Sequence, residues 1–150
     1  MAWMLDRKFI GYTSTPFTTD VERGRLRFFA KAIGETDLIY TDEEAARRAG
    51  HPDLPVPPTF FFCLEMDRPD PYGWFDDLGV ELPKVLHGEQ RFQYHRMAYA
   101  GDRLRFESTV VDIYDKKGGL LEFLVQDNRI TNQRDERVAE FLRTIVIRHG

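Results

Sequence analysis

The first apolar pattern in the chain has helical spacing. In residues 19–34, TDVERGRLRFFAKAIG, apolar residues recur every three or four positions and stop at Gly34. Thr19 and Glu22 stand three positions apart at the start of this segment, which is the spacing of a capping box. The pattern predicts a helix whose apolar side, including Phe28, packs against the rest of the protein.

Two further segments in the first half have patterns of their own. Thr41 and Glu44 form a second capping box at DEEAARRA, so a short helix is expected to end at Gly50. Prolines then lead into the apolar run TFFFCL, which predicts a buried helix at about Pro58–Met66. Residues 67–79, DRPDPYGWFDDLG, are rich in Pro, Asp and Gly and predict a loop.

The second half of the chain alternates between apolar and polar residues. This period of two predicts long strands, separated by turn signals such as DKKGG. The four predicted strands are Val85–Arg96, Asp102–Tyr114, Leu120–Thr131 and Arg137–Arg148. Because the links between them are short, we expect an antiparallel meander. Helices followed by strands predict an α+β fold in which the Phe-rich helix covers the apolar face of the sheet.

The first predicted strand contains two of the four histidines in the chain. Read in alternation, one face carries His87, Glu89, Arg91, Gln93 and His95. A histidine and a carboxylate two residues apart on one face can act together as a general base. The same pattern is typical of a polar outer face or of a dimer seam, and both interpretations are open.

Composition and charge narrow the possible partners. The chain has 150 residues, of which 42% are hydrophobic and 13% aromatic, and we expect one domain over residues 1–150. The net charge is −4 and runs of Lys and Arg are short, which argues against a nucleic-acid partner. Apolar segments stay shorter than about 18 residues, so a membrane-spanning helix is not expected.

The cysteine content points to a reducing compartment. Cys63 is the single cysteine, which excludes an internal disulfide, and its neighbours lack metal-ligand spacing. The opening MAWMLDRKF lacks the basic and long apolar regions of an export signal. These features predict a cytoplasmic protein without a bound metal.

The stretch VLHGEQRFQYHRMAYAGDRL, followed by two long strands, resembles the N-terminal-type domain of MaoC-like acyl dehydratases, also called the FAS1-like dehydratase domain. The resemblance covers about Phe17 to Ile147 and rests on the motif HGEQ…YHR…GD. It implies a hot-dog fold, in which an antiparallel sheet wraps a central apolar helix. It also implies addition or removal of water on acyl thioesters of coenzyme A or acyl carrier protein, without a further cofactor.

The resemblance also indicates candidate catalytic residues. Hydratase-active members carry D-x-N-P-x-H followed by x-D, whose Asp and His hold and activate the water. Aligned on Asp42 of AIGETDLIYTD, the Asp falls on Glu35, the Asn on Asp37 and the His on Tyr40. A phenol, with an ordinary pKa of about 10, is a poor base at neutral pH. Glu35 and Tyr40 are therefore catalytic candidates with altered identities, and Asp37 is a candidate for substrate binding. A helix-end carboxylate and an aromatic pocket wall are the alternative roles of the first two.

Other candidates surround the buried helix. Active hydratases have V-H-G-M where this helix begins, with the Gly N–H facing the thioester carbonyl. The equivalent residues here are Pro57, Pro58, Thr59 and Phe60. Because proline has no N–H, Thr59 is the candidate oxyanion donor. Phe60 is a candidate wall of an acyl-binding tunnel as well as a core residue, and His95 and Arg96 are candidates for contact with a coenzyme phosphate.

The leading hypothesis is an acyl-thioester hydratase or dehydratase. The catalytic candidates are Glu35, Tyr40, His87 and Glu89. In one version this chain performs the water chemistry, and in the other it is the substrate-holding subunit while a partner supplies the Asp and His. A non-catalytic acyl-CoA binding module and a hot-dog thioesterase are the alternatives. Because a hot-dog sheet leaves an exposed edge, we expect a homodimer or a heterodimer with a second hot-dog subunit.

Overall fold

The computed structural model describes residues 4–150, so residues 1–3 of the N-terminal stretch considered above lie outside it. One antiparallel sheet of five strands, in the order β1-β3-β4-β5-β2, forms the frame of the molecule. The strands are β1 (Phe17–Asp20), β2 (Val85–Tyr94), β3 (Arg103–Lys116), β4 (Leu121–Thr131) and β5 (Arg137–Arg148). The predicted α+β class and the four long strands are confirmed.

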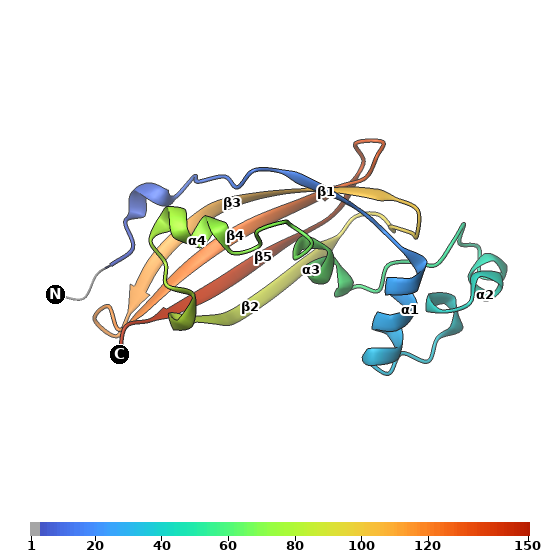
Figure 1. The fold of residues 1–150 in the computed structure, drawn as a ribbon, viewed down its shortest axis with the longest axis horizontal. Helices are drawn as coiled ribbons and strands as arrows, with labels where there is room; N and C mark the ends of the chain where they lie inside the picture. Colours follow the sequence, from blue (N-terminus) through green and yellow to red (C-terminus); the bar gives the residue numbers. More distant parts are fainter. Residues whose placement is uncertain (1–3) are drawn as a thin grey trace.

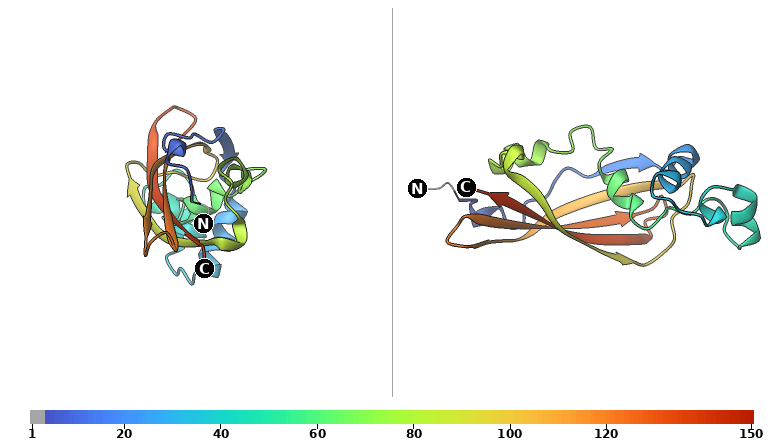
Figure 2. Two further views of the ribbon diagram at one scale, coloured as in Figure 1. Left: turned by 90° about the vertical axis from the view of Figure 1, so that its left-hand side faces the viewer. Right: turned by 90° about the horizontal axis from the view of Figure 1, so that it is seen from below.

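Short helices occupy the concave side and one end of the sheet. They are α1 (Arg23–Ala32), α2 (Glu43–Arg48), α3 (Phe60–Glu65) and α4 (Gly73–Leu78), with single 3₁₀ turns at Arg7–Phe9, Leu38–Tyr40 and Leu82–Lys84. The sheet curves around α3 and α4, while α1 and α2 lie beyond one end and the C-terminus lies at the other (Figures 1 and 2). Within residues 4–150, every helix is too short or too polar to cross a membrane.

The predicted meander is correct only for β3, β4 and β5. β2 pairs with β5, where Phe92 stands opposite Phe141, and so forms one edge of the sheet. After β2, residues 95–102 carry the chain away to the far side of the sheet instead of turning directly back. β1, which was not predicted, pairs with β3 and stacks the ring of Phe17 on that of Phe106 with centroids 5.2 Å apart.

The first helix begins later than its capping-box pattern predicts. Thr19 lies in β1 and donates to Asp67 instead, at 2.8 Å, while Glu22 occupies the N-cap without a side-chain hydrogen bond. With this start the helix buries Leu26 and Ala30, and Phe28 is 76% exposed. The second helix is capped by Asp42, which accepts from the Ala45 N–H, rather than by Thr41.

The Phe-rich helix is confirmed, and a second helix replaces the predicted loop. α3 lies within the predicted segment and buries Phe60, Phe61 and Leu64. α4 occupies the second half of residues 67–79 and buries its apolar side chains, including Trp74, against the sheet. Gly79 adopts a left-handed conformation, with φ +71°, and ends α4, so this glycine marks the end of a helix rather than a turn within a loop.

The inner face of the sheet carries two hydrophobic cores separated by polar side chains. One core surrounds α3 and includes Leu26 and Phe141, and the other surrounds α4 and includes Trp74 and Ile145. The residues between them are Ser14, Glu65, Arg68, Gln90, Ser108, Gln126, Asn128 and Arg143. We call these eight residues the polar belt.

Strand register brings the members of the polar belt side by side. The Ser14 N–H donates to the Ser108 carbonyl at 3.1 Å, and Ser108 stands opposite Asn128. Arg143 stands opposite Gln126 on one side and opposite Gln90 on the other. The belt therefore crosses the N-terminal segment and four of the five strands at one level.

Candidate functional site

A cavity of about 390 Å³ opens where α3 begins. Its walls come from the 3₁₀ turn Leu38–Tyr40, from the segment before α3, from α3 itself and from the end of β2 and the segment that follows. They are formed by Tyr40, Val56, Pro58, Phe61, Tyr94, His95, Arg96, Met97 and Ala98. We call it the mouth cavity. Three of the predicted site residues, Tyr40, His95 and Arg96, are brought together in it.

Glu35 and Asp37 lie close to Tyr40. The Glu35 carboxylate accepts from the Asp37 N–H at 2.9 Å, and Asp37 caps the 3₁₀ turn by accepting from the Ile39 N–H at 3.1 Å. Burial raises the pKa of Tyr40, and the negative charges of Glu35 and Asp37 raise it further. The phenol therefore stays protonated at neutral pH and can donate a hydrogen bond, but it is a poor base.

His95 and Arg96 are held at the cavity by β5 and by the turn before it. Both backbone N–H groups donate to the Val138 carbonyl, at 2.9 and 3.0 Å. The His95 ring nitrogen is 3.5 Å from Glu140, and the Arg96 guanidinium is 3.0 Å from Glu136. The side chain of Arg96 is half exposed, so part of its guanidinium faces solvent at the edge of the mouth cavity.

Tyr94 is a site residue that sequence reasoning did not assign, although it belongs to the quoted YHR motif. Its hydroxyl donates to the Pro58 carbonyl at 2.7 Å, and its ring lies 6.1 Å from that of Phe61. Burial raises its pKa. Tyr94 therefore ties the end of β2 to the entrance of α3 and fixes the width of the mouth cavity.

Thr59 and Phe60, the two predicted site residues at the start of α3, lie in different environments. Thr59 is exposed and forms the N-cap of α3, beside the mouth cavity. Phe60 is buried among core side chains, with its ring 4.9 Å from that of Phe29, so in this structure it is a core residue. The neighbouring rings line cavities instead, Phe61 the mouth cavity and Phe62 a second, smaller cavity of about 220 Å³.

The expectation that His87 and Glu89 share one face is wrong. The register between β2 and β5 shifts between these residues, which makes Gly88 the extra residue of a β-bulge. His87 faces inward, with its ring 5.7 Å from that of Phe62 and a ring nitrogen 2.9 Å from the Gln90 side-chain oxygen. Glu89 is exposed and pairs with Arg91 at 3.0 Å. The pair is therefore separated, and neither residue lines the mouth cavity.

Comparison with protein families places the chain in a known group. The pattern of the FAS1-like, dehydratase domain region matches residues 8–141. The chain belongs to this family. A UPF0336 protein of Saccharopolyspora erythraea is 40% identical over 146 residues, which cover 96% of this chain and 92% of that protein. A UPF0336 protein of Streptomyces coelicolor is 38% identical over 115 residues, covering 76% and 77%. The predicted resemblance is confirmed.

Solved structures confirm the hot-dog fold of this FAS1-like dehydratase family member. The HadBC (3R-hydroxyacyl-ACP dehydratase) complex from Mycobacterium tuberculosis matches with a TM-score of 0.77 and 26% identity, covering 92% of this chain and 96% of that chain. The ChsH1-ChsH2 complex from the same organism matches with a TM-score of 0.74 and 28% identity, covering 93% and 90%. The R-hydratase PhaJ1 from Pseudomonas aeruginosa, at 16% identity and a TM-score of 0.69 over 94% and 83%, shares the fold.

Proposed function

We propose that the chain is the substrate-holding subunit of an acyl-thioester hydratase or dehydratase and acts with a second hot-dog chain. The observation that carries the proposal is the chemistry of the mouth cavity. A protonated phenol, Tyr40, lines it, and the sequence resemblance aligns this residue with the water-activating imidazole of the family. A donor can hold and polarise a thioester carbonyl, but it cannot remove a proton from water. The partner would supply the Asp and His.

The remaining groups of the mouth cavity suit the two ends of a thioester. Arg96, which keeps part of its guanidinium toward solvent, and His95 offer donors to the phosphates of coenzyme A or of a carrier protein. Phe61 and Met97 offer apolar surface to the acyl group. We propose that Asp37 and Thr59 contribute by shaping the 3₁₀ turn and the start of α3 that border this space. The reaction would take place in the cytoplasm and require no cofactor beyond the thioester.

The proposed partner would pair along β2. This strand has ten residues and is hydrogen-bonded on one side only, to β5, so its other edge is open in the chain from residue 4 onward. An open edge of this length is normally covered by another chain. Two of the similar solved structures are themselves complexes of two named chains, HadBC and ChsH1-ChsH2. These observations favour an edge-to-edge dimer with a second hot-dog subunit.

The test is hydration of crotonyl-CoA, followed by the loss of enoyl absorbance. The purified chain alone should turn over weakly or not at all. Mixing it with a hot-dog chain that has D-x-N-P-x-H intact should give activity, and Tyr40→Phe in this chain should lower that activity by about tenfold or more because one donor to the carbonyl is lost. Arg48→Ala, at the exposed end of α2, is the matched control and should leave activity unchanged.

Three outcomes would contradict the proposal. Rapid turnover by the chain alone, abolished by Glu35→Ala, would show that this chain performs the water chemistry itself. Saturable binding of acyl-CoA with every partner and no turnover would indicate a binding module. Release of free thiol without change in enoyl absorbance would indicate a thioesterase instead.

A further inference from the structure

The polar belt contains donors that the protein leaves unused. In the part of the chain that the structure describes, four buried side-chain atoms have no hydrogen-bond partner: Ser14 Oγ, Arg68 Nη2, Gln90 Nε2 and Arg143 Nε. All four belong to the polar belt. Buried polar atoms are normally satisfied, because leaving one unpaired costs about 1–3 kcal/mol. Three of the four are N–H donors and the fourth is a hydroxyl, so the missing partner is rich in oxygen acceptors.

The buried charges of the belt do not balance. The Glu65 carboxylate lies between two guanidinium groups, 3.3 Å from Arg143 and 4.0 Å from Arg68. The exposed fractions of these side chains are 2%, 8% and 10%. Burial is the main influence on Arg68 and lowers its pKa, and the charge of Arg143 acts in the same direction. A guanidinium nevertheless remains charged in proteins. One carboxylate therefore faces two cations, and the group that would complete the belt carries one negative charge.

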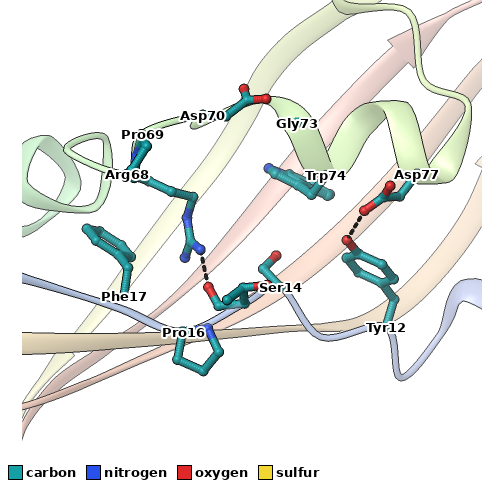
Figure 3. Close-up of a pocket in the computed structure, with 11 residues that line it drawn as sticks. Tyr12, Ser14, Pro16, Phe17, Arg68, Pro69, Asp70, Gly73, Trp74 and Asp77 are labelled. Atoms are coloured by element: carbon teal, nitrogen blue, oxygen red, sulfur yellow. Dashed lines mark hydrogen bonds between the residues drawn. The ribbon is translucent and has the colours of Figure 1, made fainter.

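A cavity of about 400 Å³ lies beside two of these donors, which are themselves buried in its wall. Arg68 and Ser14 both line it, together with the rings of Phe17 and Trp74. Figure 3 shows the Arg68 side chain passing between Phe17 and Trp74 toward the segment that contains Ser14. The guanidinium lies 4.4 Å from the centroid of the Phe17 ring, and its Nη1 donates to the Thr15 carbonyl, which leaves Nη2 for a ligand. The volume is within the range of small-molecule sites.

Two further carboxylates limit what can enter. Asp70 and Asp77 line the same cavity but are exposed, and Asp77 already accepts a hydrogen bond of 2.5 Å from the Tyr12 hydroxyl (Figure 3). Solvent screens their charges more strongly than those of the buried groups. They still disfavour a ligand with two negative charges, such as a phosphate monoester. The cavity therefore suits a single carboxylate attached to an apolar body.

We propose that this cavity binds a small aliphatic monocarboxylate. The carboxylate accepts from Arg68 Nη2 and Ser14 Oγ, and the hydrocarbon packs on the Trp74 and Phe17 rings. The site is separate from the mouth cavity, with which it shares no lining residue. The proposal of this site therefore does not depend on the proposed function, and the two are tested separately.

Trp74 provides a direct test. The chain contains two tryptophans, so in a Trp3→Phe background Trp74 is the single fluorophore of its kind. Titration with hexanoate should change its emission saturably, while 1-hexanol and hexyl phosphate should bind at least tenfold more weakly. Ser14→Ala should weaken hexanoate binding by about tenfold, the effect of removing one hydrogen bond to a charged group. Thr13→Ala, next to Ser14 but outside the cavity, is the matched control.

Arg68→Met should abolish hexanoate binding. Far-ultraviolet circular dichroism and a thermal melt show whether this variant is folded, and the loss of binding supports the proposal only if it is. If this variant does not fold, the test is the ratio of the hexanoate affinities of the Ser14→Ala and Thr13→Ala proteins. Absence of a saturable Trp74 response to hexanoate would overturn the proposal. So would equal affinity for 1-hexanol, or equal affinity of the Ser14→Ala and Thr13→Ala proteins for hexanoate.

Discussion

Tyr12 joins the N-terminal segment to α4 through its hydrogen bond to Asp77, and the same environment alters its acidity. Burial raises the pKa of Tyr12 to about 12, and the hydrogen bond and charge of Asp77 add to the effect. In the unfolded chain the phenol has its ordinary pKa of about 10. As pH rises from 10 to 12, the unfolded state loses the Tyr12 proton first, so the contribution of this group to stability falls across that window.

A Tyr12→Phe variant tests this linkage. The difference in the free energy of unfolding between the native chain and the variant should be constant below about pH 9 and should shrink as pH rises through 10 to 12. Urea unfolding at pH 8, 10 and 11 measures it, and all other titrating groups cancel in the difference. Parallel curves for the two proteins over the whole range would show that the folded-state pKa is not raised.

At the same scale, the sequence singled out residues that meet in the mouth cavity, although it did not predict that they would meet there. Tyr40, His95 and Arg96 come from separate motifs and line one cavity because their segments border the start of α3. The pairing of His87 with Glu89 fails because strict alternation assumes an unbroken strand. Nor could alternation reveal the polar belt. Ser108 in β3 and Arg143 in β5 are single polar residues on otherwise apolar faces, while β4 contributes Gln126 and Asn128. Only the register between the strands shows that these residues meet.

Among the elements, the β2 bulge has a tight steric requirement. A Cβ placed on Gly88 would lie 2.8 Å from a methyl group of Val146 and 3.1 Å from the backbone oxygen of Thr144. The added Cβ would have to displace this methyl group, and it could not move away from it because the Thr144 backbone on its other contact is held by the sheet. Gly88 therefore permits the shift that turns His87 inward and Glu89 outward.

Gly88→Ala should lower the free energy of unfolding by about 1–3 kcal/mol, the usual effect of an added methylene in a packed position. Gly24→Ala in α1 is the control, because a Cβ there meets nothing within 4 Å, and it should be neutral or slightly stabilising. Chemical unfolding of both variants measures the two changes in the free energy of unfolding. Equal stability of the two alanine variants would contradict the close packing at the bulge.

The predictability of the elements followed the strength of their sequence patterns. The four strands, each of ten or more residues, and the apolar α3 have patterns that tertiary contacts do not override. β1 and α4 have four and six residues and were missed. Their sequences give little periodic signal, and their conformation is fixed by the surfaces that they cover. The capping-box start of α1 failed for the same reason, since pairing with β3 extends the chain through Thr19.

For the whole molecule, the position of β2 at the edge of the sheet determines how it can assemble. Leu86 lies on the outer side of this strand and is 50% exposed, close to the open edge. An edge-to-edge partner would cover it. The chain of 17.6 kDa should therefore sediment as a dimer, or as a complex when the second subunit is present.

Leu86→Asp should shift the sedimentation of the chain toward the monomer, because the new charge would be buried at the edge. Ile10→Asp is the control. Ile10 is also exposed but follows the first 3₁₀ turn, whose main contacts are with β3. The assembly of the Ile10→Asp protein should match that of the native chain. A native chain that stays monomeric with and without a second hot-dog subunit would remove the basis for this edge as an interface.

Gly150 ends the chain at the opposite pole of the sheet from α1 and α2 (Figure 1). The 3₁₀ turn Leu38–Tyr40, which lies between those two helices in the chain, contributes to the wall of the mouth cavity, so this cavity borders the end of the sheet that is far from Gly150. An immobilising tag on the last residue would thus orient each molecule on a sensor chip with its entrance directed into the flowing sample. Binding kinetics of acyl carriers could then be recorded without obstruction from the support.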